Sequence, residues 1–441
     1  AYCALATASS NKQKITINLE NINLVGNNSN GAVAKIRGGS EMNVKSGTVI
    51  TGKNNYVGIE AVGNNTVVNI YDNVNIYQNG TGSYVGGIVG ASYNATMNIY
   101  GGYGKSAKCG IIVMSTGATI NVSGGEWIAN NDGTVANDNN AVLVSQNNRY
   151  ETGWACKSIL NVTGGTFKGG YNCYGSGPGV EPDDAQINIK GGNFNSNPAT
   201  YVVAGYGSVE DNGIWTVAKA YDITEEGATI YSVAGLKWLA EQVNGGNNFS
   251  KKVVKLAADL DLNNEEWTPI GTSSKPFNGT FDGQNKKISN LVITGNKSDV
   301  GLFGRTNDGE IKNLVVENAK VVGRLNVGVV AGTPYTSKFN NITVQGHVEV
   351  NGMAYVGGVG GKNAYANWNN VTVNVDETSY VNANSVEDGV AYRTYVGGVC
   401  GFNGEGGHSF TNITSNIDVK GSTIDVGGLF GIAHYGNQFE N

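Results

Sequence analysis

The chain has 441 residues, a formal net charge of −6, 66 Gly and only 6 Pro, a composition that excludes both a collagen and a Pro-rich linker. Its 29 Lys and Arg residues are scattered, so neither nucleic acid nor an anionic membrane is expected as a partner. No stretch reaches the ~18–20 apolar residues of a membrane span, and a hydrophobic content of 40% is enough for a folded core.

The first half repeats a short β segment with an Asn at its centre. Successive copies are 26, 29, 23, 40 and 27 residues apart, and Gly-Gly follows the last four after one residue. The six copies are Met42-Asn43-Val44, Val68-Asn69-Ile70, Met97-Asn98-Ile99, Ile120-Asn121-Val122, Leu160-Asn161-Val162 and Ile187-Asn188-Ile189. Core and turn positions therefore repeat together.

A second short strand recurs between these segments. Its copies begin at Gly31, Gly58, Gly87, Gly110 and Asn140. A repeat of this length cannot bury its apolar face alone, so it must stack on its neighbours as a parallel coil. The 40-residue interval is one coil with a loop inserted, roughly Asn130 to Trp154. Neither a leucine-rich consensus nor propeller blades are present.

The end of the first array and the start of the second carry distinct signals. Two β-prone runs flank Asp211-Asn212-Gly213, which predicts a hairpin that caps the first array, and a boundary is expected near Ala220. Ser232 to Asn244 has one apolar face and ends at Gly245-Gly246, which predicts a helix that caps the second array.

The second half repeats a different segment. Its five copies lie 27, 29, 40 and 30 residues apart, and an Asn-containing strand separates each pair. They are Val300-Gly301-Leu302-Phe303-Gly304, Val327-Gly328-Val329-Val330-Ala331, Val356-Gly357-Gly358-Val359-Gly360, Val396-Gly397-Gly398-Val399-Cys400 and Val426-Gly427-Gly428-Leu429-Phe430. Two alternating strands again share one period.

These segments carry a family resemblance. Residues 221–441 resemble GLUG-motif proteins, whose hallmark is a Gly-Gly-hydrophobic-hydrophobic-Gly segment, although Ala331 and Cys400 depart from it. The resemblance implies a right-handed β-helix on a secreted or surface-anchored bacterial protein. The first half looks more loosely like Gly-Gly-Thr-Phe β-helix repeats of similar proteins. The expected fold is all-β: two consecutive right-handed parallel β-helices, residues 1–220 and 221–441, with a short capping helix before the second.

Catalytic and metal-binding signals are weak. Some GLUG proteins carry a metallopeptidase domain, but this chain has no His-Glu-x-x-His motif. Asp183-Asp184 is the only adjacent Asp pair, and no matching His or basic element lies downstream. Asp259, Asp261, Glu265 and Glu266 could offer oxygen ligands to calcium, or could simply be solvated charges beside buried leucines. We expect no catalytic residues, no metal and no cofactor.

The five cysteines have no CxxC spacing, so buried, unpaired thiols are expected. A disulfide between Cys156 and Cys173 stays an open alternative.

The predicted binding surface is aromatic. Tyr71 and Tyr100 each follow a core Ile, so they should point outward and stack one coil apart, with Lys45 in the same column. Tyr56 and Tyr84, each before Val-Gly, form a possible second column. Exposed rings of this kind can dock on sugar faces, but outward tyrosine ladders can also simply stabilise a sheet.

In the second array Tyr355 and Tyr395 occupy the place of that second column. The sequence thus favours a secreted or cell-surface adhesin-like protein, monomeric and non-catalytic, that presents a host or glycan partner with its columns and with the loops Asn130 to Trp154, Tyr171 to Ala185 and Asp376 to Tyr395. The alternative hypothesis is a β-helical polysaccharide lyase or hydrolase, and a third hypothesis is a phage or capsule-linked tailspike.

Overall fold

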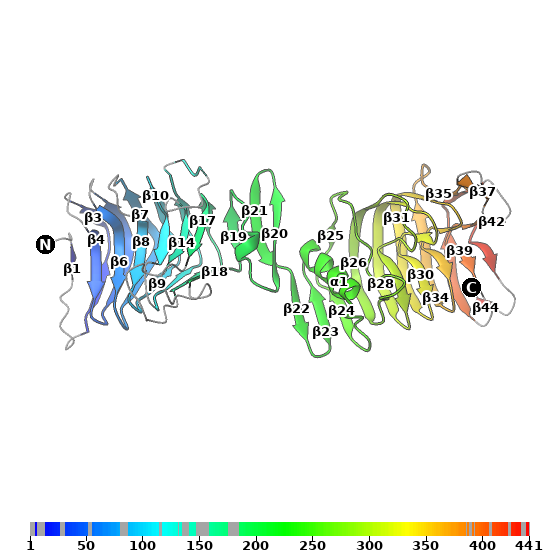
Figure 1. Ribbon diagram of the computed structural model, residues 1–441, viewed down its shortest axis with the longest axis horizontal. Coiled ribbons are helices and arrows are strands. Elements are labelled where there is room, and N and C mark those ends of the chain that lie inside the picture. The colour runs from blue at the N-terminus through cyan, green and yellow to red at the C-terminus, as the bar shows by residue number, and fades with distance from the viewer. Residues whose placement is uncertain are drawn as a thin grey trace. The chain divides into compact units, whose positions relative to one another are not determined.

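The fold is described from a computed structural model, which describes residues 5–6, 14–26, 31–51, 55–79, 87–113, 117–130, 132–134, 141–146, 158–174, 185–384, 386–387, 390–391, 393–404, 408–421, 425–433 and 438–440. Through these residues the chain winds as a parallel β-solenoid of about 13 turns, which confirms the predicted fold class. The chain divides into two compact units, Ala1–Lys219 (unit 1) and Ala220–Asn441 (unit 2) (Figure 1).

Two parallel sheets form unit 1. In order along the first sheet the strands are β1 (Leu5–Ala6), β4 (Gly31–Arg37), β6 (Asn55–Val62), β8 (Gly87–Ser92), β11 (Ile111–Val113), β14 (Leu143–Gln146) and β17 (Tyr171–Tyr174). The second sheet contains β2 (Thr16–Leu19), β3 (Ile22–Val25), β5 (Glu41–Ile50), β7 (Val67–Gln78), β9 (Thr96–Ile99), β10 (Tyr103–Ser106), β12 (Thr119–Val122), β13 (Glu126–Ile128), β15 (Ser158–Val162), β16 (Thr166–Lys168), β18 (Ala185–Ile189) and β19 (Gly192–Phe194).

The Asn-centred segments stack in the predicted register. Asn43 lies opposite Asn69, and Asn69 opposite Asn98, and the pairing continues to Asn188. The flanking apolar residues, including Ile70 and Ile99, are fully buried. One further copy, beyond the six predicted, is Ile17-Asn18-Leu19, which pairs in register with β5. Equivalent apolar residues therefore form continuous columns inside the coil.

The predicted register of the other sheet is wrong by one to two residues. The glycine alignment places Ile59 beside Ile88, but Ile59 lies opposite Val89, and Ile111 lies opposite Leu143 rather than Ala141. The β8 segment is buried at every position, so it lacks the inside–outside alternation that fixes strand register. A glycine was therefore a poor marker of register here.

Unit 1 ends in the predicted hairpin. Strands β20 (Tyr206–Asp211) and β21 (Ile214–Lys219) are antiparallel, with a turn at Asn212 and Gly213, and β21 pairs antiparallel to β19. Antiparallel pairing covers the edge that the last coil would otherwise expose. A 3₁₀ turn, Ala199–Tyr201, precedes the hairpin.

Unit 2 begins with a hairpin and the predicted helix. Strands β22 (Tyr221–Thr224) and β23 (Gly227–Ile230) are antiparallel, and helix α1 (Val233–Gly245) follows. Ser232 is the N-cap residue, and Gly246 ends the helix in the left-handed conformation. The apolar face of α1, with Leu236, Leu239 and Val243, is buried in the core of unit 2, so the helix covers its first coil.

The coils of unit 2 have three faces. The largest sheet contains β22, β23, β24 (Val253–Leu256), β25 (Leu260–Asp261), β26 (Thr280–Ile293), β28 (Glu310–Val322), β31 (Lys338–Gly352), β34 (Asn367–Val375), β35 (Tyr380–Ala383), β40 (Ser409–Ser415), β41 (Asp418–Gly421) and β44 (Gln438–Glu440). The second contains β27 (Phe303–Asn307), β30 (Ala331–Tyr335), β33 (Gly360–Asn363), β39 (Cys400–Asn403) and β43 (Phe430–Ala433). The third contains β29 (Val327–Gly328), β32 (Tyr355–Gly357), β38 (Tyr395–Gly397) and β42 (Asp425–Gly427). A short hairpin, β36 (Val386–Glu387) with β37 (Val390–Ala391), lies apart from these sheets.

The five glycine-rich segments stack in register, as predicted. Val300 bridges Val327, and Val327, Val356, Val396 and Val426 pair in turn. A side chain at Gly358 or Gly398 would meet the next coil: a Cβ on Gly358 would lie 2.3 Å from the Gly398 carbonyl oxygen. Close coil-to-coil contact at this corner therefore requires glycine.

The Asn residues of the second array stand at bends. Asn313, Asn341, Asn370 and Asn412 all have φ between 51° and 54°, the left-handed region that Asn tolerates. Asn341, Asn370 and Asn412 each donate to the equivalent Asn of the preceding coil at 2.8–3.0 Å, and Asn313 donates to the Asp282 carboxylate at 3.0 Å. This ladder links the bends of successive coils through their side-chain amides.

Cys109 and Cys400 are fully buried thiols, as expected. Burial raises the pKa of the Cys400 thiol to about 12, so that thiol stays protonated and unreactive at neutral pH. The Cys173 thiol is free and donates to the Ala185 carbonyl oxygen at 2.9 Å, whereas Cys156 lies outside the described residues.

Candidate functional site

One column of exposed side chains runs along unit 1, and we name it the outer column. Each member directly follows the last core residue of an Asn-centred strand, so all members occupy the same outward position on successive coils. The members are Glu20, Lys45, Tyr71, Tyr100, Ser123, Thr163 and Lys190. All are exposed, which places a varied set of groups in one line.

Tyr71 and Tyr100 point outward one coil apart, as predicted, and their rings are in tilted contact. Their ring centroids lie 5.2 Å apart with the planes tilted by 31°, and the residues are 37% and 48% exposed. The next position of the outer column holds Ser123, whose small side chain leaves the far face of the Tyr100 ring without an aromatic neighbour. Tyr100 thus offers the more open ring face of the pair.

An asparagine ladder borders the outer column. Asn43, Asn69, Asn98, Asn121, Asn161 and Asn188 each donate through Nδ2 to the Asn Oδ1 of the preceding coil, beginning at Asn18, at 2.8–3.1 Å. An amide has two N–H donors and an acceptor with two lone pairs, so the ladder uses only part of its capacity. The rest faces the same side as the tyrosines, two residues along each strand.

Lys45 lies in the outer column, but it has a partner. Its ammonium donates to the Glu20 carboxylate at 2.7 Å, and this bond raises the pKa of Lys45. Exposed pairs of this kind contribute little stability, and two N–H donors of the ammonium remain for a ligand. Tyr84 lies outside the described residues, and so does the side chain of Tyr56, so the second column of unit 1 stays a prediction.

Tyr355 and Tyr395 stack in unit 2, with ring centroids 5.4 Å apart and planes 4° from parallel. Tyr395 is only 8% exposed, because Phe402 packs edge-on against it at 5.1 Å and the Arg393 guanidinium lies 5.2 Å from its ring centroid. This pair is therefore part of the packed structure and offers much less free ring surface than Tyr71 and Tyr100.

The acidic residues considered for calcium are engaged locally. Asp259 accepts from the Lys287 backbone N–H, Asp261 from Asn290, Glu265 from Lys237 and Glu266 from Thr294. Within the described ranges no three His, Cys, Asp or Glu side chains are grouped so as to hold a metal ion. Asp183 and Asp184 lie outside those ranges.

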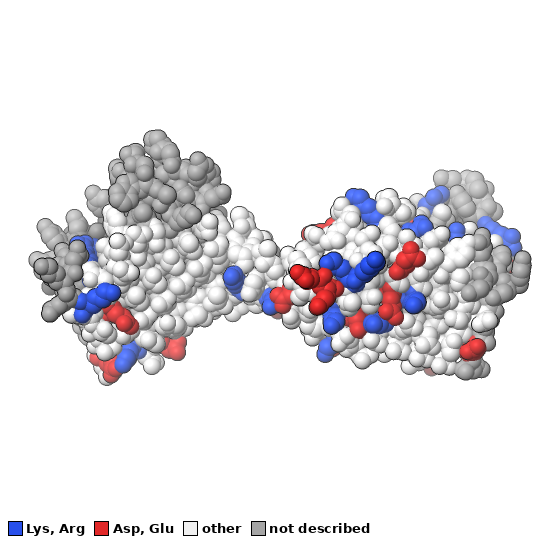
Figure 2. Space-filling model, turned by 90° about the horizontal axis from the view of Figure 1, so that it is seen from below, with Lys and Arg blue, Asp and Glu red and all other residues white. Residues whose placement is uncertain are grey.

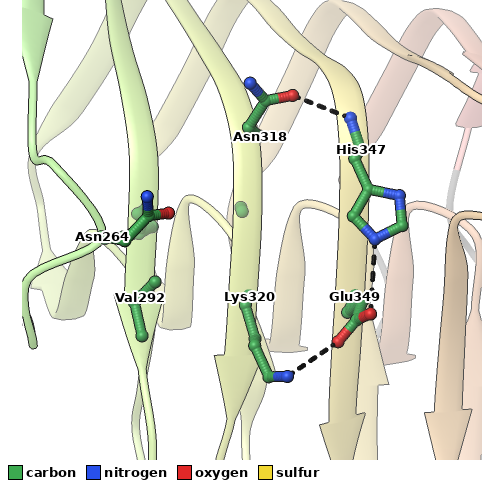
Figure 3. A pocket seen from close by; sticks show the side chains of 8 residues that line it. Asn264, Val292, Asn318, Lys320, His347 and Glu349 are labelled. Carbon is green, nitrogen blue, oxygen red and sulfur yellow. Dashed lines mark hydrogen bonds and ion pairs between the residues drawn. The ribbon is translucent and has the colours of Figure 1, made fainter.

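A pocket on unit 2 had no sequence signal. It has a volume of about 200 Å³ and is lined by Asn264, Leu291, Val292, Asn318, Ala319, Lys320, His347 and Glu349; we name it the Val292 pocket (Figure 3). It forms because Val292 is short, whereas Lys320 and Glu349 are long at the same position of the next two coils. Figure 2 shows Lys, Arg, Asp and Glu side chains close together on one face of unit 2.

His347 joins two carboxylates beside this pocket. Its Nε2 lies 3.3 Å from Glu349 and its Nδ1 3.2 Å from Asp376. These two interactions, Glu349 first, raise the pKa of His347 above its ordinary value of 6.5. The same contact, with help from Lys320, lowers the pKa of Glu349. Hydroxyls of Thr378 and Ser379 hold the pKa of Asp376 well below its usual range.

A histidine with a raised pKa stabilises the folded state at acid pH. This stabilisation is complete below the ordinary pKa of 6.5 and is lost as the pH rises through the raised value. An NMR titration of the His347 ring should give a pKa above 6.5, and Asp376→Asn should lower it. A ring that titrates at or below 6.5 in the unaltered protein would contradict this arrangement.

No helix in the described part of the chain is long and apolar enough to cross a membrane.

Comparison with known proteins gives one distant similarity. The chain is 28% identical to Halomucin of Haloquadratum walsbyi over 215 residues, which cover 46% of this chain and 2% of Halomucin. No protein-family model matches the chain, and no solved structure matches it. The resemblance to GLUG-motif proteins therefore stays a prediction.

Proposed function

We propose that the chain is a non-catalytic surface protein whose first unit binds a glycan along the outer column. The parallel solenoid and the distant similarity to Halomucin fit a surface protein. The GLUG-like segments of the second half favour the same placement. The observation that carries the binding proposal is the exposed pair Tyr71 and Tyr100, whose rings are in contact one coil apart.

The chemistry of the outer column suits a sugar chain. The open face of Tyr100 provides an apolar surface for the C–H face of a sugar ring. Beside it, the spare amide groups of Asn98 and Asn121 and the hydroxyl of Ser123 can exchange hydrogen bonds with sugar hydroxyls. The Asn amides recur on successive coils, so a polymer that lies along the column meets one amide per coil and the two tyrosine rings at adjacent coils.

A glycan array probed with the full chain tests this proposal. Tyr71→Ala with Tyr100→Ala should lower binding to the preferred polysaccharide at least about tenfold, or about 1.4 kcal/mol. Tyr100→Ala alone should cost more than Tyr71→Ala, because Tyr100 has the open face. Tyr93, 45% exposed and outside the column, supplies the matched control Tyr93→Ala.

If the double variant and the unaltered chain bound the polysaccharide equally well, the outer column would not be the glycan-binding surface. The array glycans are also incubated with the protein and assayed for new reducing ends or unsaturated products. Product release would overturn the non-catalytic part and favour a polysaccharide lyase or hydrolase.

A further inference from the structure

We infer that the Val292 pocket of unit 2 binds a single neutral saccharide unit. It is built on β26, β28, β31 and the turn after β25, so none of its residues belongs to the outer column. This second site goes beyond the function proposed for unit 1. Either proposal can be refuted without affecting the other.

The size of the pocket limits its ligand. Typical small-molecule pockets measure roughly 300–1,000 Å³, and this one, at about 200 Å³, is smaller. One sugar ring fits a space of that order. Its exposed apolar side chain is that of Val292, because Leu291 and Ala319, which also line it, are buried in the core. Val292 can contact the C–H face of such a ring.

The polar groups of the pocket come in donor–acceptor pairs. The Lys320 ammonium lies 3.2 Å from the Glu349 carboxylate, and both line the pocket (Figure 3). Two neighbouring hydroxyls of a sugar can each accept from the ammonium or donate to the carboxylate without breaking this pair. Across the pocket, no described residue hydrogen-bonds the Asn264 side chain, so its amide can serve a third hydroxyl.

The charges around the pocket select a neutral ligand. The Lys320 ammonium and the Glu349 carboxylate line the pocket together and form an ion pair, so their charges offset each other. A phosphate or uronate would meet the Glu349 carboxylate, and a cationic ligand would meet the Lys320 ammonium. A neutral hexose or N-acetylhexosamine meets neither repulsion.

Saturation-transfer NMR on the full chain tests the inference. The probes are methyl glycosides of glucose, galactose, mannose and N-acetylglucosamine, with methyl glucuronide as the anionic probe. At least one neutral glycoside should bind with a dissociation constant on the order of 1 mM, as expected for about a dozen heavy atoms in one shallow site. Methyl glucuronide should bind at least fivefold more weakly.

Two variants locate the site. Val292→Trp fills the pocket and should weaken binding at least tenfold, and Glu349→Gln should weaken it at least threefold. Val315→Trp is the matched control, because Val315 is an outward, half-buried valine on β28 that does not line the pocket. Unchanged thermal melting shows that each variant is folded.

The outcomes separate the two sites. Tyr71→Ala with Tyr100→Ala should leave glycoside binding unchanged. The inference fails if no neutral glycoside binds, if methyl glucuronide binds best, or if binding survives both Val292→Trp and Glu349→Gln. None of these results bears on polysaccharide binding by unit 1.

Discussion

Trp368→Ala is expected to destabilise unit 2 by about 3–5 kcal/mol, the cost of removing a large, fully buried aromatic side chain. Trp368 belongs to an in-register column with Phe339 before it and Phe410 after it. Its ring stacks on Phe339 with centroids 5.1 Å apart, and Phe410 lies 6.2 Å away. The substitution opens a cavity that rigid coils on both sides cannot close.

Hydrogen–deuterium exchange of the full chain measures this effect. Amides of β31, β34 and β40 should exchange faster, while those of unit 1 serve as the internal reference. Trp368→Phe is the matched control, because it keeps an aromatic ring and removes an indole N–H that has no hydrogen-bond partner among the described residues. If Trp368→Ala and Trp368→Phe raised the exchange rates by the same small amount, the buried aromatic column would not be what stabilises unit 2.

Gly358→Ala is expected to cost about 1–3 kcal/mol, the range for overpacking a close contact. The added Cβ would lie 2.3 Å from the Gly398 carbonyl oxygen on the next coil, and backbone cannot move aside as a side chain can. The coils would have to separate locally, which would weaken the pairing on either side.

Gly428 provides a control at the same position of the repeat. A Cβ on Gly428 meets nothing within 4 Å, so Gly428→Ala should leave stability within about 0.5 kcal/mol. Thermal melting of the two variants, side by side, makes the comparison. Equal melting temperatures would show that the glycine pattern does not arise from coil-to-coil contact.

The fold was predictable because stacking repeats the same environment on every coil. The Asn-centred strands alternate inward apolar and outward polar residues, so their register follows directly from the pattern, as at Asn98 and Asn121. The other strand of unit 1 is buried on both sides. There the pattern does not separate the two faces, and the register was misplaced at Ile59 and Val89.

The candidate sites were predictable only in part. Tyr71 and Tyr100 were found because each directly follows a core residue, a relation that is local in sequence. The openness of Tyr100 depends on Ser123 one coil later. The Val292 pocket could not be predicted from the sequence, because its residues come from successive coils and share no motif. They include Asn264, Val292, Lys320 and His347.

The hydrogen-bonded Asn ladders could not be predicted from the sequence either, and the reason is physical. The recurrence of Asn was visible, but its role was not. Only the stacked geometry shows that Asn121 donates to Asn98 at 3.0 Å. Hydrogen bonding between coils is set by the rise from one coil to the next, a distance that the sequence of a single coil does not contain.

Engineered disulfides test in-register stacking most directly. Thr343 and Thr372 lie opposite each other on adjacent parallel strands, where neighbouring Cα atoms are about 5 Å apart, within disulfide reach. The account predicts that Thr343→Cys with Thr372→Cys cross-links on mild oxidation, as read by mass spectrometry of the digested full chain. Thr343→Cys with Asn374→Cys, displaced by two residues to about 8 Å, should not. A cross-link in the displaced pair, or none in the opposed pair, would contradict the stacked coils on which the core, the outer column and the Val292 pocket all depend.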